Sequence, residues 1–145
     1  SLLDNHQRLE MVYRATIEYS KLKPSDIEFD LKKPNYTIDT LTYLFEKHPK
    51  HEFALIMGED NLKSFHKWKN YELILENHSI YVYPRLSKGK IDTQFDNHPR
   101  ILKISAPIME LSSTFIRNEI KSGRNVRPML PEKVWHYIDE MNFYK

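Results

Sequence analysis

The longest apolar run in the chain, Phe53 to Met57, is the feature that most restricts its fold. Five consecutive apolar residues followed by Gly58 are typical of a short strand covered on both faces, as in a parallel sheet. The run is far shorter than the ~20 residues that a membrane-spanning helix needs. It therefore predicts a buried parallel strand and argues against a membrane protein.

Strand and helix patterns alternate along the rest of the sequence. We expect further strands at residues 27–31, 79–83 and 101–104, where β-branched and aromatic residues gather. Capping residues and a proline place expected helix starts near Asp4, Thr37, Ser112 and Pro131, and two short helical stretches are expected through Leu62, Phe65 and Trp68 and from Tyr71 to Glu76. The alternation predicts an α/β fold with a mainly parallel sheet and helices on both faces. No repeat or linker interrupts it, so we expect one domain over residues 1–145.

Three more local expectations follow from the same patterns. The first helix carries apolar residues at the helical period, namely Leu9, Val12, Tyr13 and Ile17. The last helix carries a stripe that is expected to be buried, formed by Val134, Trp135 and Ile138. Residues 85–99 are mostly polar and are expected to form an exposed loop around Gly89.

Composition excludes several classes of site. The chain has only three glycines, Gly58, Gly89 and Gly123, so neither a dinucleotide-binding Gly-x-Gly-x-x-Gly nor a Walker A loop is present. It has no cysteine, which excludes disulfides, thiol catalysis and Zn–Cys sites and fits a reducing cytoplasm. The net charge is +2, too small an excess to indicate a dedicated nucleic-acid-binding domain.

A first candidate site is the helix start at Ser112 to Arg117. Hydroxyls and unpaired N–H groups at a helix N-terminus attract anions, and Arg117 shares a helix face with Ser113 and Thr114. These groups together would bind phosphate oxygens. An ordinary N-cap with a surface arginine is the alternative.

A second candidate site follows the buried strand. Gly58 would let a ligand approach the backbone, and Asp60 could accept hydrogen bonds from ribose hydroxyls. The alternative is a turn that caps the next helix. In the following stretch, Trp68 offers a face on which a flat ring could stack, whereas Phe65 fits a core position. No His-Glu-x-x-His pattern, carboxylate pair or activated serine indicates a metal or a protein nucleophile.

In combination, these segments resemble a known family along almost the whole chain. Five segments occur in order, and they are Arg8-Leu9-Glu10-Met11, Tyr36-Thr37-Ile38-Asp39-Thr40-Leu41, Gly58-Glu59-Asp60-Asn61, Phe65-His66-Lys67-Trp68 and Ser112-Ser113-Thr114-Phe115-Ile116-Arg117. The series closely resembles bacterial nicotinate mononucleotide adenylyltransferases. The last segment is shared with other nucleotidyltransferases, such as pantetheine-phosphate adenylyltransferases. The segments that begin at Tyr36 and at Phe65 indicate the nicotinate branch of the superfamily.

The resemblance implies a Rossmann-like nucleotidyltransferase fold and a cytoplasmic enzyme of NAD biosynthesis. It would transfer AMP from ATP to nicotinate mononucleotide with Mg²⁺, giving deamido-NAD and pyrophosphate. The family motifs imply that Ser113, Thr114 and Arg117 bind the phosphates of ATP. They imply that Gly58 and Asp60 bind its ribose, and that Thr37 and Trp68 bind the nicotinate. The expected partners are these two substrates and possible further copies of the chain. A pantetheine-phosphate adenylyltransferase and a non-catalytic nucleotide-binding module are the alternatives.

One family element has no counterpart in the sequence. The family opens with a strand and a Gly-x-Phe-Asp-Pro-x-His-x-Gly-His segment, whose histidines stabilise the reacting phosphates, and none of the seven histidines here fits that pattern. We therefore expect the first strand or strands and the catalytic histidines to be absent from this chain. Residues 1–145 alone are then expected to be inactive.

Overall fold

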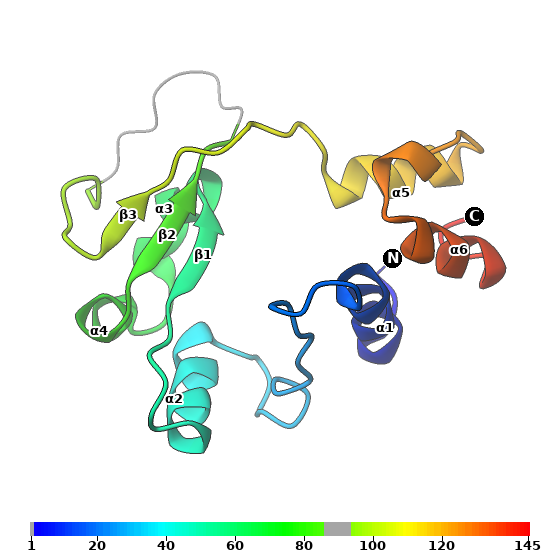
Figure 1. The fold of residues 1–145 in the computed structure, drawn as a ribbon. Helices are drawn as coiled ribbons and strands as arrows, with labels where there is room; N and C mark the ends of the chain where they lie inside the picture. Colours follow the sequence, from blue (N-terminus) through cyan, green and yellow to red (C-terminus); the bar gives the residue numbers. More distant parts are fainter. Residues whose placement is uncertain (1, 86–93) are drawn as a thin grey trace. The chain divides into compact units, whose positions relative to one another are not determined.

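A computed structural model describes residues 2–85 and 94–145, which belong to two compact units (Figure 1). The terminal unit joins Ser1–Asp30 to Leu111–Lys145, and the central unit comprises Leu31–Glu110. Each unit has its own hydrophobic core. Gly89, expected within a loop, lies outside the described residues.

The central unit is built on a parallel sheet. Its strands β1 (Leu55–Gly58), β2 (Ile80–Tyr83) and β3 (Ile101–Lys103) lie in the order β1-β2-β3. Because the three strands run in the same direction, their carboxyl ends share one edge, where ligands bind in open α/β sheets. The parallel sheet predicted from the sequence is confirmed.

Helices cover one face of this sheet. They are α2 (Thr37–Lys47), α3 (Glu59–Ser64), the 3₁₀ turn η1 (Phe65–Lys67) and α4 (Tyr71–Asn77). The core between these helices and the sheet contains five side chains whose exposed fraction is below 2%, and they are Leu62, Phe65, Ile74, Ile80 and Val82. Burying each of these side chains contributes roughly 1.5–3 kcal/mol, so this layer is the main stabilising element of the unit.

The opposite face of the sheet is exposed within the unit. Ile56 pairs with Tyr81, and Tyr81 pairs with Leu102, so the three side chains line one face. Ile56 is 75% exposed, and the other two are each 38% exposed. The expectation that the apolar run is covered on both faces is therefore not met by the central unit taken by itself.

The terminal unit consists of helices. They are α1 (Asn5–Thr16), α5 (Ser113–Lys121), the 3₁₀ turn η2 (Arg127–Met129) and α6 (Glu132–Glu140). Asp4 caps α1 in a capping box with Gln7, as the sequence predicts for Asp4. The buried residues of the unit come from α5, α6 and their connections, and they are Ile120, Val126, Val134, Ile138 and Phe143.

Two expectations, the strand at residues 27–31 and the burial of Trp135, are wrong. Residues 27–31 form turns rather than a strand, because among the described residues no neighbouring strand offers them hydrogen-bond partners. The helix expected from the spacing of Leu9, Val12, Tyr13 and Ile17 is present, but Val12, Tyr13 and Ile17 are 47–49% exposed, and Met11 and Ala15 pack against the core instead. Trp135 is only partly buried.

One expectation about a loop and one about a helix cap also need correction. Phe95 lies in the segment predicted to be polar and exposed, yet it is 5% exposed and its ring packs 5.4 Å from that of Phe65. The three large apolar residues of this segment, Leu86, Ile91 and Phe95, follow no regular period in the sequence, so the burial of Phe95 could not be read from the pattern. The sequence predicts Thr37 as the cap of α2, but Tyr36 occupies the N-cap position and Thr37 is the first helical residue.

Candidate functional site

The carboxyl end of β1 is crowded around Gly58. A β-carbon at this position would overlap Oδ1 of Asp60 and would lie 3.2 Å from Cγ of Arg85 and 3.3 Å from the Tyr83 ring. The backbone of Gly58 is extended, with φ −79° and ψ 157°, so no unusual conformation requires glycine here. Close approach of neighbouring side chains explains the glycine, and the approach of a ligand to its backbone stays a prediction.

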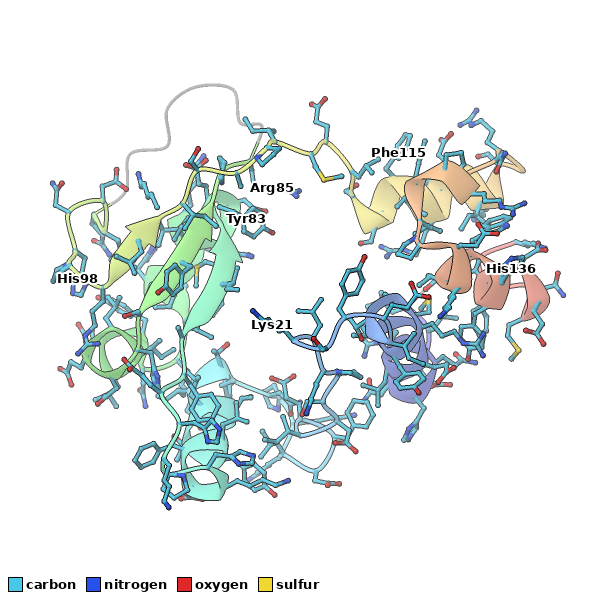
Figure 2. All side chains as sticks on the ribbon, viewed as in Figure 1. Lys21, Tyr83, Arg85, His98, Phe115 and His136 are labelled. Carbon is cyan, nitrogen blue, oxygen red and sulfur yellow. The ribbon has the colours of Figure 1, made fainter. Side chains whose placement is uncertain are left out.

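Asp60 and Arg85 meet at this end of the sheet. Oδ1 of Asp60 lies 4.0 Å from Nε of Arg85, and the Arg85 backbone N–H donates to Oε2 of Glu59 at 3.3 Å. Figure 2 shows Tyr83 and Arg85 at the end of β2. The Asp60 side chain is 62% exposed, so its oxygens are accessible to a ligand.

Sequence reasoning missed Arg85. Its neighbour across the sheet is known only once β2 is paired in register beside β1. A cation directly after a predicted strand is the signal that could have identified it, because ligands bind beyond strand ends. The structure therefore adds a positive charge to the site that the sequence assigned to Gly58 and Asp60.

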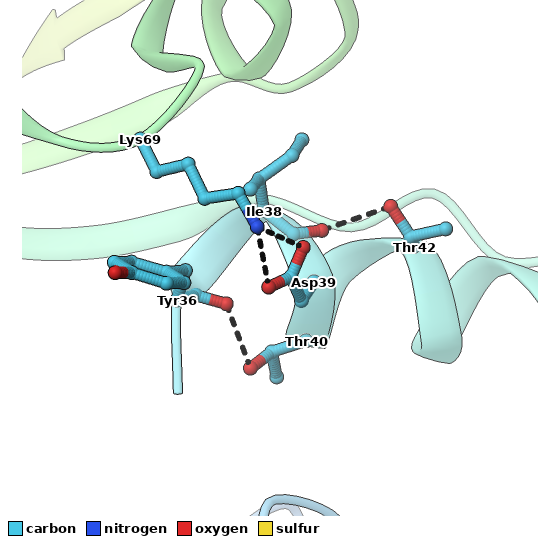
Figure 3. A network of polar contacts seen from close by, with 6 residues as sticks. All are labelled: Tyr36, Ile38, Asp39, Thr40, Thr42 and Lys69. Carbon is cyan, nitrogen blue, oxygen red and sulfur yellow. Dashed lines mark hydrogen bonds and ion pairs between the residues drawn. The ribbon is translucent and has the colours of Figure 1, made fainter. Parts of the chain in front are cut away.

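Neighbours of Thr37 and Trp68 in the sequence are joined by polar contacts. Thr37 begins α2, and Trp68 follows η1. Lys69, next to Trp68, donates two hydrogen bonds to Asp39 of α2, at 3.0 and 3.2 Å (Figure 3). The Trp68 ring packs edge-on against Phe65 with centroids 5.3 Å apart. Trp68 is half-buried and Phe65 fully buried, as the sequence suggested.

The helix start at Ser112 to Arg117 lies in the terminal unit. Ser112 is the N-cap of α5 and accepts a hydrogen bond from the Phe115 N–H at 3.1 Å. Ser113 and Thr114 occupy the first two helical positions, where backbone N–H groups have no partner within the helix. Nη2 of Arg117 donates to Oγ1 of Thr114 at 3.2 Å. The predicted shared face of Thr114 and Arg117 is confirmed.

A second arginine accompanies Arg117 in this unit. Burial raises the pKa of the Tyr144 phenol above its ordinary value, while the positive charges of Arg117 and Arg8 act in the opposite direction on that pKa. Arg8 belongs to a segment that carries the family resemblance, but the sequence assigns it no role, because helix α1 and the chain end are far apart in sequence.

The hydroxyls and the guanidinium group at the start of α5 are groups that can bind anions. Within residues 2–85 and 94–145 no group of three or more histidine, aspartate and glutamate side chains could hold a metal ion. In this described part of the chain, no helix is both long and apolar enough to cross a membrane. The site residues predicted from the sequence lie in three groups, two in the central unit and one in the terminal unit.

Comparisons with known proteins agree with the resemblance. No family model matches the chain. A protein of Christiangramia forsetii is 66% identical over 145 residues, which are 100% of this chain and 75% of that protein. A protein of Flavobacterium johnsoniae is 63% identical with the same coverage. Both carry the name "Probable nicotinate-nucleotide adenylyltransferase".

A solved structure shows the same fold. The nicotinic acid mononucleotide adenylyltransferase of Plasmodium falciparum, complexed with NaAD, matches 99% of this chain and 76% of its own, with a TM-score of 0.75 and 23% identity. This likeness confirms the Rossmann-like nucleotidyltransferase fold. High identity to relatives of which the chain covers three quarters establishes the family. The chain belongs to the nicotinate-nucleotide adenylyltransferases.

Proposed function

We propose that the protein transfers AMP from ATP to nicotinate mononucleotide and so forms deamido-NAD and pyrophosphate. The observation that carries the proposal is the 66% identity along all 145 residues to a relative named for this activity. A phosphate oxygen of nicotinate mononucleotide attacks the α-phosphorus of ATP. The bond from that phosphorus to the oxygen bridging to the β-phosphorus breaks, and pyrophosphate leaves.

The residues of this chain serve that reaction by binding and orientation. In-line transfer of a phosphoryl group depends on positioning and charge stabilisation more than on covalent chemistry by the protein. A chain that offers anion-binding groups suits this requirement.

In the terminal unit, Ser113, Thr114 and Arg117 are proposed to bind ATP phosphates. Support comes from the hydrogen bond between Arg117 and Thr114, which holds the guanidinium beside the helix start. There it can complement the N–H groups of the first turn of α5. Arg8, whose positive charge acts on the pKa of the Tyr144 phenol in the same direction as that of Arg117, is a second cation of this unit.

In the central unit, Gly58 and Asp60 are proposed to bind the adenosine ribose. The exposed Asp60 carboxylate can accept hydrogen bonds from two vicinal hydroxyls. Thr37 and Trp68 are proposed to bind the nicotinate, by a hydrogen bond to its carboxylate and by stacking on its ring.

Nucleotidyltransferases of this family generally use a divalent metal with ATP. We assign Mg²⁺ to that role as part of the Mg–ATP substrate, and no residue of this chain is assigned as its ligand. The proposal places the protein in the cytoplasm.

The test is an assay of the polypeptide encoded by the complete gene. Deamido-NAD and pyrophosphate should form in equal amounts from Mg–ATP and nicotinate mononucleotide. Nicotinamide mononucleotide and 4′-phosphopantetheine, offered separately, should react more slowly. Faster turnover of phosphopantetheine would indicate the sibling enzyme. ATP binding without turnover of any acceptor would indicate a non-catalytic module.

A further inference from the structure

Lys69 connects the segment that carries Trp68 to the first turn of α2. Its ammonium group lies 3.0 and 3.2 Å from the two carboxylate oxygens of Asp39, thirty residues away in sequence. The same group lies 4.6 Å from the centroid of the Tyr36 ring, within cation–π range. Figure 3 shows the ammonium between the aromatic ring and the carboxylate. One lysine thus makes two different contacts with the start of α2.

The α2 side of this contact is held by backbone hydrogen bonds. The carbonyl of Tyr36 accepts hydrogen bonds from the N–H groups of Asp39 and Thr40, at 3.0 and 3.2 Å. Tyr36 and Asp39 therefore belong to the same first turn as Thr37. A contact made with this turn is therefore a contact with the turn that carries Thr37.

The Trp68 side is a short connection between η1 and α4. The N–H of Trp68 donates to the carbonyl of Phe65 at 2.9 Å, and the Trp68 carbonyl accepts from Tyr71 at 3.3 Å. Asn70 adopts a left-handed conformation with φ 51°, which reverses the chain before α4. Lys69 lies in the middle of this connection, and its bond to Asp39 ties the connection to another helix.

We propose that Lys69 is a positioning residue that, through Asp39 and Tyr36, sets the spacing between Trp68 and Thr37 and thereby the affinity for nicotinate mononucleotide. The proposal rests on the proposed function, which assigns Trp68 and Thr37 to that substrate. The side chains of Lys69 and Asp39 are 42% and 44% exposed, and ion pairs this exposed add little to global stability. Loss of the pair should therefore alter substrate binding without unfolding the protein.

The experiment compares steady-state kinetics of the full-length gene product and its variants. Lys69→Met and Asp39→Asn should each raise the KM for nicotinate mononucleotide roughly five-fold or more, because a small misplacement of binding groups is costly. The KM for ATP and the melting temperature should stay unchanged. The double variant should be no worse than either single one, since both remove the same contact. Lys69→Arg should retain most of the affinity, and Lys67→Met is the matched control on the neighbouring turn.

A second measurement follows Trp68 itself. The indole N–H resonance of Trp68, assigned by its loss in Trp68→Phe, should shift in Lys69→Met and Asp39→Asn but not in Lys67→Met. Trp68→Ala separates the two proposals. If Trp68→Ala raises the KM for nicotinate mononucleotide and Lys69→Met does not, the positioning role is overturned and the proposed site stands. If neither Trp68→Ala nor Lys69→Met changes the KM for nicotinate mononucleotide, the assignment of Trp68 to the nicotinate is wrong. The positioning role, which depends on that assignment, is then overturned as well. Equal losses for both substrates with a lower melting temperature would mean a merely structural pair and would also overturn the role.

Discussion

Replacing Gly58 with alanine should separate ATP binding from folding. The added β-carbon would overlap Oδ1 of Asp60 and press on Cγ of Arg85 and the Tyr83 ring, at 3.2 and 3.3 Å. Asp60 is the neighbour that can yield, because its side chain is 62% exposed and its contact with Arg85 is long, at 4.0 Å. We therefore expect Gly58→Ala to turn the Asp60 carboxylate away from its present position.

The magnitudes for stability and binding differ. The extended backbone at Gly58 suits alanine, so the free energy of unfolding should change by less than ~1 kcal/mol. A hydrogen bond to a charged group contributes about 1.5–3 kcal/mol, so losing the Asp60–ribose contact should weaken ATP binding by roughly ten-fold or more. The expected result is a protein that melts normally and binds ATP poorly.

Calorimetric titration of ATP and thermal unfolding of the full-length gene product measure both quantities. Asp60→Ala and the double variant Gly58→Ala/Asp60→Ala complete the cycle. If the added methyl group acts by displacing Asp60, the double variant should bind ATP as Asp60→Ala does. Gly123→Ala is the opposite control. Its φ of +71° strains any side chain and its surroundings are open, so it should lower the melting temperature and spare ATP binding.

Two results would refute this reasoning. Wild-type ATP affinity in Gly58→Ala would mean that the space around Gly58 has no part in ribose binding. An equal loss from Gly58→Ala with and without Asp60 would mean that the methyl group obstructs the ligand directly and does not act by displacing the carboxylate.

Two further predictions concern α5. Arg117→Ala should lower kcat/KM for ATP about ten-fold or more by removing a charged partner of the phosphates, and an unchanged value would return this segment to an ordinary helix cap. The Arg124 guanidinium, hydrogen-bonded to Glu119, lowers the pKa of that carboxyl. A lowered folded pKa stabilises the protein above the ordinary glutamate pKa, and this contribution disappears as pH falls through the folded value. Glu119→Gln should therefore lower the melting temperature at pH 7 and progressively less toward pH 3, and a constant difference would exclude this ion pair as the cause.

Features that depend on neighbouring residues in the sequence were predictable. Asp4 and Ser112 cap their helices as expected, and Pro131 precedes the last one, because a cap bonds to N–H groups two or three residues away. Gly58 and Asp60 could also be identified from their neighbours in the sequence. They follow a buried strand, and residues after such a strand lie at the binding edge of a parallel sheet.

Features that depend on distant partners were not predictable. The alternation at residues 27–31 indicates a strand, but strand formation requires a paired neighbour. Arg85 joins the Asp60 site only through the pairing of β2 with β1, and Phe95 is buried only because the aromatic rings of Phe65 and Tyr71 lie beside it. Periodicity reports which residues could share a face and does not report what covers that face.

Neighbouring residues of β1 test this distinction directly. Met57 is 5% exposed and Ile56 is 75% exposed, although the sequence suggested that both are covered. In the chain of residues 1–145, Met57→Ala should lower the free energy of unfolding by about 2–5 kcal/mol, whereas Ile56→Ala should cost at most ~1 kcal/mol through strand propensity. Urea unfolding followed by circular dichroism measures both. A comparable loss for Ile56→Ala would show that the face shared by Ile56, Tyr81 and Leu102 is covered in solution, and the burial first inferred from the apolar run would then be correct.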